Sequence, residues 1–139
     1  MAYTLVQTAT GGVMMRDEAS SAVGSLVLSL GWNVTRAPTN TVTVGTLPAN
    51  AQIISIVIHV PVVSNAVTTA TVSVGLSGGS ATAFCAAQDV KGALGNFSQA
   101  ATASWVPSTA KQDITCTYTE TGGASTSGTF SVDVLYRVL

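Results

Sequence analysis

The chain has 139 residues, of which 47% are hydrophobic and only 8% charged, and its formal net charge is −1. Disordered chains combine few apolar residues with many charges, so this composition argues against disorder. The five Lys and Arg residues are scattered singly, which argues against a nucleic-acid partner because phosphate binding requires clustered positive charge. The length fits one domain over residues 1–139, and no linker or internal repeat divides it.

Apolar residues do not run far enough to predict a membrane span, which needs about 18 consecutive apolar residues. The longest run, residues 56–63, is interrupted by His59 and Pro61. Residues 1–15 lack the basic residues and the long apolar segment of a secretory signal. We therefore expect a protein made in a cytoplasm and without a membrane partner.

Alternation of apolar and polar residues runs through most of the chain and predicts β-strands that bury one face. The alternating segments, in chain order, are residues 24–35, 41–45, 53–60, 70–76, 113–120 and 128–139. Turn-forming residues stand between them at 10–12, 37–40, 47–50, 77–80 and 121–125. The plausible helical pieces are 14–23 and part of 84–94. The pattern predicts an all-β, single-domain antiparallel β-sandwich of the jelly-roll type, with about eight to ten short strands and minimal helix.

Residues 46–60, TLPANAQIISIVIHV, form the longest strongly apolar stretch and contain the only histidine. Pro48 and Asn50 predict a turn before the strand. Alternation assigns one side of the strand to the core, namely Ile54, Ile56, Ile58 and Val60. It assigns the opposite side to the surface, namely Ser55, Val57 and His59. We therefore expect His59 in solvent or at a subunit contact.

A catalytic role for His59 would require an orienting carboxylate and a nucleophile from elsewhere in the fold. Residues 75–79, GLSGG, match the nucleophile-elbow pattern G-x-S-x-G, but no helix is predicted after Ser77. The histidine also precedes the serine, against the order that fold requires. A glycine-rich turn is the better interpretation. Acidic residues are few and dispersed, so the sequence predicts no catalytic residue.

The two cysteines, Cys85 and Cys116, lack CxxC spacing and have no histidine nearby in sequence, so no zinc site is expected. In a reducing compartment two buried thiols are favoured over a disulfide. Neither a metal nor a cofactor is predicted.

Aromatic and methionine side chains give further candidates for a contact surface. Trp32 falls on the apolar side of its segment, which favours a core position. Trp105, next to Val106 and Pro107, is the better surface candidate. Met14 and Met15 follow a TGG turn and suit either a core edge or a contact surface. The candidate interface residues are Met14, Met15, Ser55, Val57, His59 and Trp105.

The sequence also resembles a known class of proteins. It contains TGGVMMRDEAS, then VTVGTLPANAQIISIVIHV, then ATVSVGLSGGSATAF and a final TFSVDVLYRVL. This layout, with an LPANA turn leading into a long apolar strand, is similar to small β proteins of tailed-bacteriophage virions. Among these it most resembles the jelly-roll capsid cement or decoration proteins. The resemblance implies binding to the major capsid protein over capsomer junctions, as a homodimer or homotrimer that stabilises the shell.

Three functions from different classes follow. The first is a non-enzymatic structural protein on the capsid surface of the virion. The second is a glycan- or receptor-binding β-sandwich of a phage tail or fibre. The third, which the scarcity of histidine and acidic residues makes the weakest, is a small hydrolase or lyase. An uncharged surface rich in Thr and Ser suits the first, because such a surface does not repel its neighbours.

Overall fold

The computed structural model describes residues 3–7, 13–17, 28–34, 39–101 and 105–139, and all ten of its elements are β-strands. In chain order they are β1 (Tyr3–Gln7), β2 (Val13–Asp17), β3 (Leu28–Val34), β4 (Thr39–Leu47), β5 (Ala51–Val62), β6 (Thr69–Leu76), β7 (Cys85–Asp89), β8 (Gly95–Ser98), β9 (Gln112–Thr121) and β10 (Thr129–Val138). Within these residues no helix is long and apolar enough to cross a membrane.

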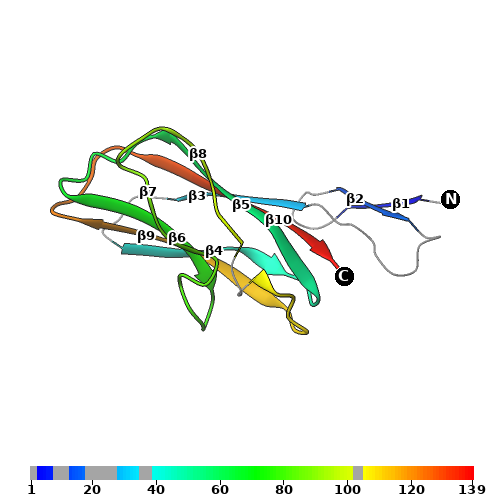
Figure 1. The fold of residues 1–139 in the computed structure, drawn as a ribbon. Helices are drawn as coiled ribbons and strands as arrows, with labels where there is room; N and C mark the ends of the chain where they lie inside the picture. Colours follow the sequence, from blue (N-terminus) through cyan, green and yellow to red (C-terminus); the bar gives the residue numbers. More distant parts are fainter. Residues whose placement is uncertain (1–2, 8–12, 18–27, 35–38, 102–104) are drawn as a thin grey trace.

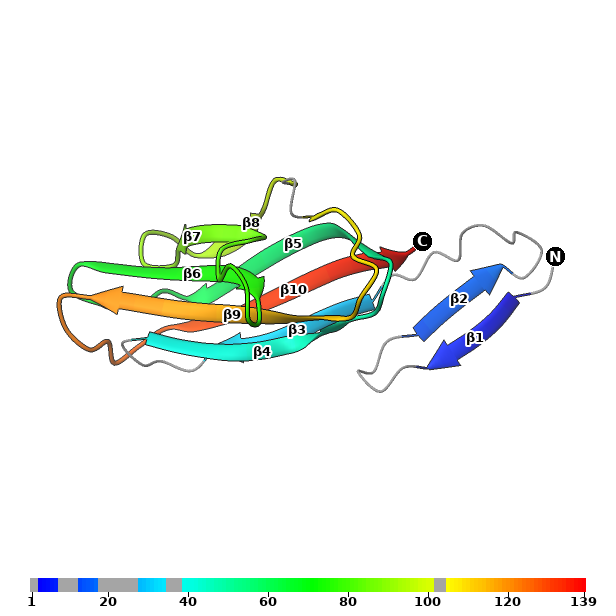
Figure 2. The same cartoon turned by 90° about the horizontal axis from the view of Figure 1, so that it is seen from below.

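The strands from β3 to β10 form two four-stranded antiparallel sheets, which lie against each other as a sandwich (Figure 1). The first sheet has the order β3-β10-β5-β8, and the second has the order β4-β9-β6-β7. The strands β1 and β2 pair with each other in a separate two-stranded sheet (Figure 2).

The strand pairing is nested. β6 pairs with β7, β5 with β8, β4 with β9, and β3 with β10, and successive pairs alternate between the two sheets. A long antiparallel ribbon that rolls up on itself produces this connectivity, which is that of the eight-stranded jelly roll. The predicted all-β sandwich of the jelly-roll type is therefore confirmed.

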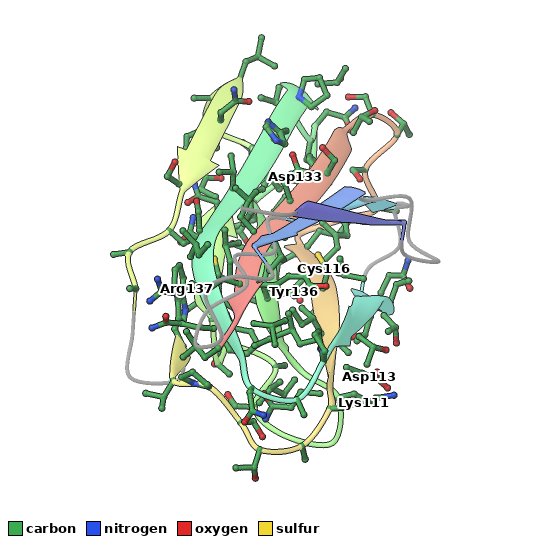
Figure 3. All side chains as sticks on the ribbon, turned by 90° about the vertical axis from the view of Figure 1, so that its right-hand side faces the viewer. Lys111, Asp113, Cys116, Asp133, Tyr136 and Arg137 are labelled. Carbon is green, nitrogen blue, oxygen red and sulfur yellow. The ribbon has the colours of Figure 1, made fainter. Side chains whose placement is uncertain are left out.

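The core fills the space between the sheets with one face of each alternating strand. Figure 3 shows Cys116 and Tyr136 between the two sheets. The fully buried side chains include Ile56, Ile58 and Val60 from β5, Phe130, Val132 and Val134 from β10, Val72 and Val74 from β6, and Ile114, Cys116 and Tyr118 from β9. The register pairs Trp32 of β3 with Val132, but the Trp32 side chain lies outside the described part. Burial of apolar surface on both inner faces is the main force that holds the layers together.

Ile54 departs from the predicted face of β5. Its side chain is 48% exposed, whereas its neighbour Ile53 is 5% exposed. The ladder between β5 and β10 shifts here: Leu135 pairs with Ser55, and Tyr136 pairs with Ile53. This β-bulge inserts Ile54 as an extra residue and reverses the phase of the alternation. The prediction that Ile54 is buried is therefore wrong, while the outer and inner rows from Ser55 onward follow the predicted pattern.

The helical pieces also need correction where the structure describes them. Residues 14–17 belong to β2, and Cys85–Asp89 form β7. Residues 18–23 lie outside the described part of the chain. β7 forms a ladder with β6, in which Asp89 pairs with Thr71, and this pairing outweighs a weak local preference for helix.

Candidate functional site

The outer face of the β3-β10-β5-β8 sheet carries the residues that the sequence singled out on β5. Ser55, Val57 and His59 are each part-exposed, and the residues between them are buried. Neither their burial nor their contacts test an interface, so their role at a contact with another chain stays a prediction.

His59 joins three strands through its two ring nitrogens. Nδ1 lies 2.6 Å from Oδ1 of Asn96 on β8, and Nε2 lies 2.6 Å from Oδ2 of Asp133 on β10. Asn96 is the direct ladder partner of His59, whereas Asp133 is diagonal to it. The side chains of His59 and Asp133 are 31% and 32% exposed. We call His59, Asn96 and Asp133 the histidine cluster.

The histidine cluster favours the charged form of the imidazole. The hydrogen bond to Asn96 contributes most to raising the pKa of His59 above 6.5, the bond to Asp133 adds to it, and partial burial opposes it. Both acceptors are oxygen atoms, so only the imidazolium, with an N–H on each nitrogen, donates to both. A general base needs a ring nitrogen with a free lone pair aimed at its nucleophile. The arrangement therefore suits a structural link better than catalysis.

Metal ligands do not converge in the described residues. No group of three or more His, Cys, Asp or Glu side chains in that part of the chain could hold a metal ion. Cys85 and Cys116 are buried free thiols, as predicted. They pair with the same residue, Val74, from opposite sides of β6, so a strand separates them.

The second sheet presents a contrasting outer surface of short hydroxyl side chains. These residues, which we call the threonine face, are Thr41 and Thr43 from β4, Thr117 and Thr119 from β9, and Thr71 and Ser73 from β6; all are exposed or part-exposed. The ladder aligns Thr41, Thr117 and Ser73 in one row across three strands. The Oγ1 atoms of Thr41 and Thr117 lie 2.9 Å apart. The threonine face carries no charged side chain.

The loops at one end of the sandwich are held by a buried polar network that the sequence did not reveal. The Tyr118 hydroxyl donates to Oε2 of Glu120 at 2.6 Å and lies 3.0 Å from Oγ of Ser64. Oε1 of Glu120 accepts the backbone N–H of Ser125 at 3.0 Å. Nearby, Oδ1 of Asn65 accepts the N–H groups of two residues in the β9–β10 loop. This network fixes the β5–β6 loop against the β9–β10 loop.

Trp105 does not lie on the surface, so the predicted surface position is wrong. Its side chain is 5% exposed, and Nε1 donates to the carbonyl oxygen of Phe84 at 3.3 Å. The neighbouring Val106 is 69% exposed and takes the outward position instead. The single N–H donor of an indole can bond to a backbone carbonyl, so burial of the ring leaves no polar atom without a partner.

Met14 and Met15 lie on β2, where the ladder pairs them with Val6 and Leu5 of β1. Their side chains lie outside the described part of the chain, so their role at a contact surface stays a prediction. Sequence reasoning missed Asn96 and Asp133, which are 37 and 74 residues from His59. Only the strand register brings them together.

Similar folds occur in solved structures of phage capsids. One chain of the cyanophage Pam1 capsid asymmetric unit has a TM-score of 0.68 and 19% identity, over 96% of this chain and 98% of that chain. A chain of the acidic stable capsid structure of the Helicobacter pylori bacteriophage KHP30 has a TM-score of 0.65 and 15% identity, over 82% of this chain and 89% of that chain. A chain of the capsid of Ralstonia phage GP4 has a TM-score of 0.62 and 18% identity, over 86% of this chain and 88% of that chain.

No protein-family model matches the chain, and no curated protein does. At these identities, the three structures show that the chain shares its fold with chains found in phage capsids.

Proposed function

We propose that this chain is a structural, non-enzymatic virion protein that binds the outer surface of a phage capsid and stabilises the shell. The observation that carries the proposal is the near-complete overlap, in both directions, with a chain of a phage capsid: 96% of this chain and 98% of the other. The similarity is thus to a whole small protein and not to one lobe of a large one. The sequence resemblance to capsid cement proteins points to the same role.

The surface chemistry of the second sheet supports a docked position. The threonine face offers hydroxyl groups that can donate or accept hydrogen bonds, and its six residues carry no charge that would have to be desolvated on contact. The exposed Asp89 of β7, the ladder partner of Thr71, borders this face. Next to the threonine face, the edge strand β4 pairs with β9 alone in the described part of the chain, and it has neither a charged residue nor a proline between Thr39 and Leu47. Natural edge strands usually carry such residues to prevent pairing with other chains. An edge without them suits a protein that works in contact with neighbours.

The proposed partners are the major capsid protein and further copies of this chain. A symmetric shell repeats the same local environment, which favours a closed homodimer or homotrimer at each position. We propose that residues 1–139 act as one domain in this assembly. In the virion the protein would occupy the capsid surface after synthesis in the host cytoplasm.

Addition of the purified protein to capsid shells that lack it tests this function. We expect co-sedimentation with the shells at a saturating and constant stoichiometry, and a higher temperature of DNA release from filled particles. Binding to isolated tails or fibres in place of shells, or saturation of shells without any gain in stability, would contradict the proposal.

The alternative of a glycan-binding module receives no support from the described side chains. Such modules stack sugars on exposed aromatic rings, but Trp105, Phe84, Tyr118, Phe130 and Tyr136 are all buried. A small hydrolase is also disfavoured, because both ring nitrogens of His59 are engaged with oxygen acceptors.

A further inference from the structure

The edge strand β8 is held to the first sheet by few interactions. It has four residues, Gly95–Ser98, and among the described strands it pairs with β5 alone. Phe97 is half-buried and packs on the core, and beyond the strand the N–H of Gln99 donates to the carbonyl oxygen of Ile56 at 2.9 Å. A short edge strand of this kind has a low free energy of local opening. Any additional link between β8 and the rest of the sheet should therefore change the free energy of local opening of β8 measurably.

The histidine cluster is such a link, and it depends on a proton. The imidazolium donates from Nδ1 to Asn96 on β8 and from Nε2 to Asp133 on β10, so it joins β8 to the centre of the sheet. A neutral imidazole carries one N–H and can donate to only one of these oxygens. The carboxylate of Asp133 is the stronger acceptor, so the N–H stays on Nε2 and the charge-assisted bond from Nδ1 to Oδ1 of Asn96 is lost. Only a weaker neutral bond can replace it, and that bond requires the Asn96 amide to turn over and donate from Nδ2.

Few charged groups lie around His59, so the protonation of His59 itself is the main change of charge in the histidine cluster as the pH varies. From β10, Asp133 faces it; from β8, none of the four residues is titratable; on β5, His59 is the only titratable residue. Arg137 of β10 faces the same side but donates from Nε to Oε1 of Gln52, near the start of β5.

We propose that His59, Asn96 and Asp133 form a proton-dependent clasp, which fixes the edge strand β8 to the sheet when His59 is protonated and releases it when the imidazole is neutral. Release exposes the β5 edge at Val57–Val60, where the strand of a neighbouring chain could pair. The proposal concerns this strand alone and does not depend on the function proposed above.

The sign of the pH dependence follows from linkage. The pKa of His59 is raised in the folded protein, so the stabilisation is fully present below the unfolded value of 6.5 and is lost as the pH rises through the folded pKa. The clasp is therefore closed below the unfolded value of 6.5 and opens as the pH rises through the folded pKa of His59.

Amide hydrogen exchange measured by NMR tests the clasp. The reporter is the Gln99 amide, and the reference is the Val90 amide, which donates to Ala70 in the other sheet. Each protection factor already corrects for the intrinsic pH dependence of exchange, and their ratio removes any change in stability that both amides share. In the wild type we expect this ratio to fall about three- to tenfold between about pH 5.5 and about pH 8.5, with the midpoint at the His59 pKa from its own ring resonances.

The variants separate the clasp from a general effect of pH. We call the fall of this ratio with rising pH the pH-dependent step. Asn96→Ala, at an exposed edge position, and His59→Gln should each abolish it. Asp133→Asn should move the midpoint of the step to lower pH. The matched control is Gln52→Ala, which removes another side-chain hydrogen bond between β5 and β10 and should keep the step. A step that survives in His59→Gln, a wild-type ratio that is constant with pH, or a His59 pKa at or below 6.5 would each overturn the proposal.

Discussion

Tyr118 of β9 stacks on Phe130 of β10 across the core, with ring centroids 5.3 Å apart and an interplanar angle of 22°. The two strands belong to different sheets, so this pair connects the layers directly. Both side chains are 0% exposed.

Truncation of this contact should destabilise the fold strongly. We expect Phe130→Ala to lower the free energy of unfolding by about 3–5 kcal/mol, because it removes buried apolar surface and leaves a cavity. Urea denaturation followed by fluorescence measures this difference. Leu139→Ala, at a half-exposed position, serves as the control and should change stability little. A loss below about 1 kcal/mol for Phe130→Ala would mean that the layers do not depend on this pair.

The Tyr118 hydroxyl supports the loops separately from its ring. Tyr118→Phe keeps the stacking but leaves the buried carboxylate of Glu120 without this donor. We expect a loss of about 1–3 kcal/mol in the free energy of unfolding, since a charged acceptor loses a hydrogen bond inside the protein. Thr41→Val provides the control, because it removes an exposed hydroxyl pair with Thr117. Equal losses in the free energy of unfolding for the two substitutions would show that the buried hydrogen bond contributes no more to stability than an exposed one.

The thiol of Cys116 should be inert in the folded protein. Burial raises its pKa to about 12. The thiolate is the reactive form, so at about pH 8 we expect an aromatic disulfide reagent to react with neither cysteine faster than the protein unfolds. Addition of denaturant should release both thiols at once. Fast reaction of one thiol without denaturant would indicate that the sandwich opens locally near β6.

Gly75 should not tolerate a side chain. A Cβ at this position would lie 2.2 Å from the carbonyl oxygen of Ser80 and 2.3 Å from the carbonyl carbon of Ala81. We expect Gly75→Ala to cost about 3 kcal/mol, because backbone atoms of the β6–β7 turn would have to move. Gly78→Ala is the matched control in the same turn: its Cβ would meet no atom within 4 Å, although its φ of +71° adds a strain of about 1 kcal/mol. Thermal denaturation should rank the two variants in this order.

Attachment to the shell should depend only weakly on salt. The chain has five basic and six acidic residues, so contacts with a partner rest mainly on buried area and hydrogen bonds. We expect the apparent Kd for shells to change less than about threefold between about 0.1 M and about 1 M NaCl, a range over which exposed charges become screened. Release of the protein by moderate salt alone would contradict this expectation.

The strands could be predicted from the sequence because a buried face imposes a period of two, as the row from Ser55 to Val60 shows. The exposed position of Ile54 could not be predicted from the sequence, because a β-bulge depends on the partner strand and leaves no local pattern. The burial of Trp105 could not be predicted for a related reason: its segment lacks the alternation that would indicate which way the side chain points.

The histidine cluster shows a different limit. The outward position of His59 follows from local alternation, but its two partners come from β8 and β10. Their proximity depends on which strands are neighbours and in what register they pair, which the sequence determines only through the complete fold. Local patterns thus predict which face a residue occupies, whereas its partners require the topology.

The nested pairing of the strands also imposes an order on folding. β6 and β7 are neighbours in the chain, whereas β3 must wait for β10, the strand that lies between it and β5. The loop-closure entropy of each pair grows from the inner pair to the outer one, and such distant pairings slow folding. Until residues 129–138 have been synthesised, β3 lacks its ladder partner β10, and the edge of β5 that β10 covers stays open to other chains. Newly made chains are therefore most prone to aggregation just before β10 closes the sheet.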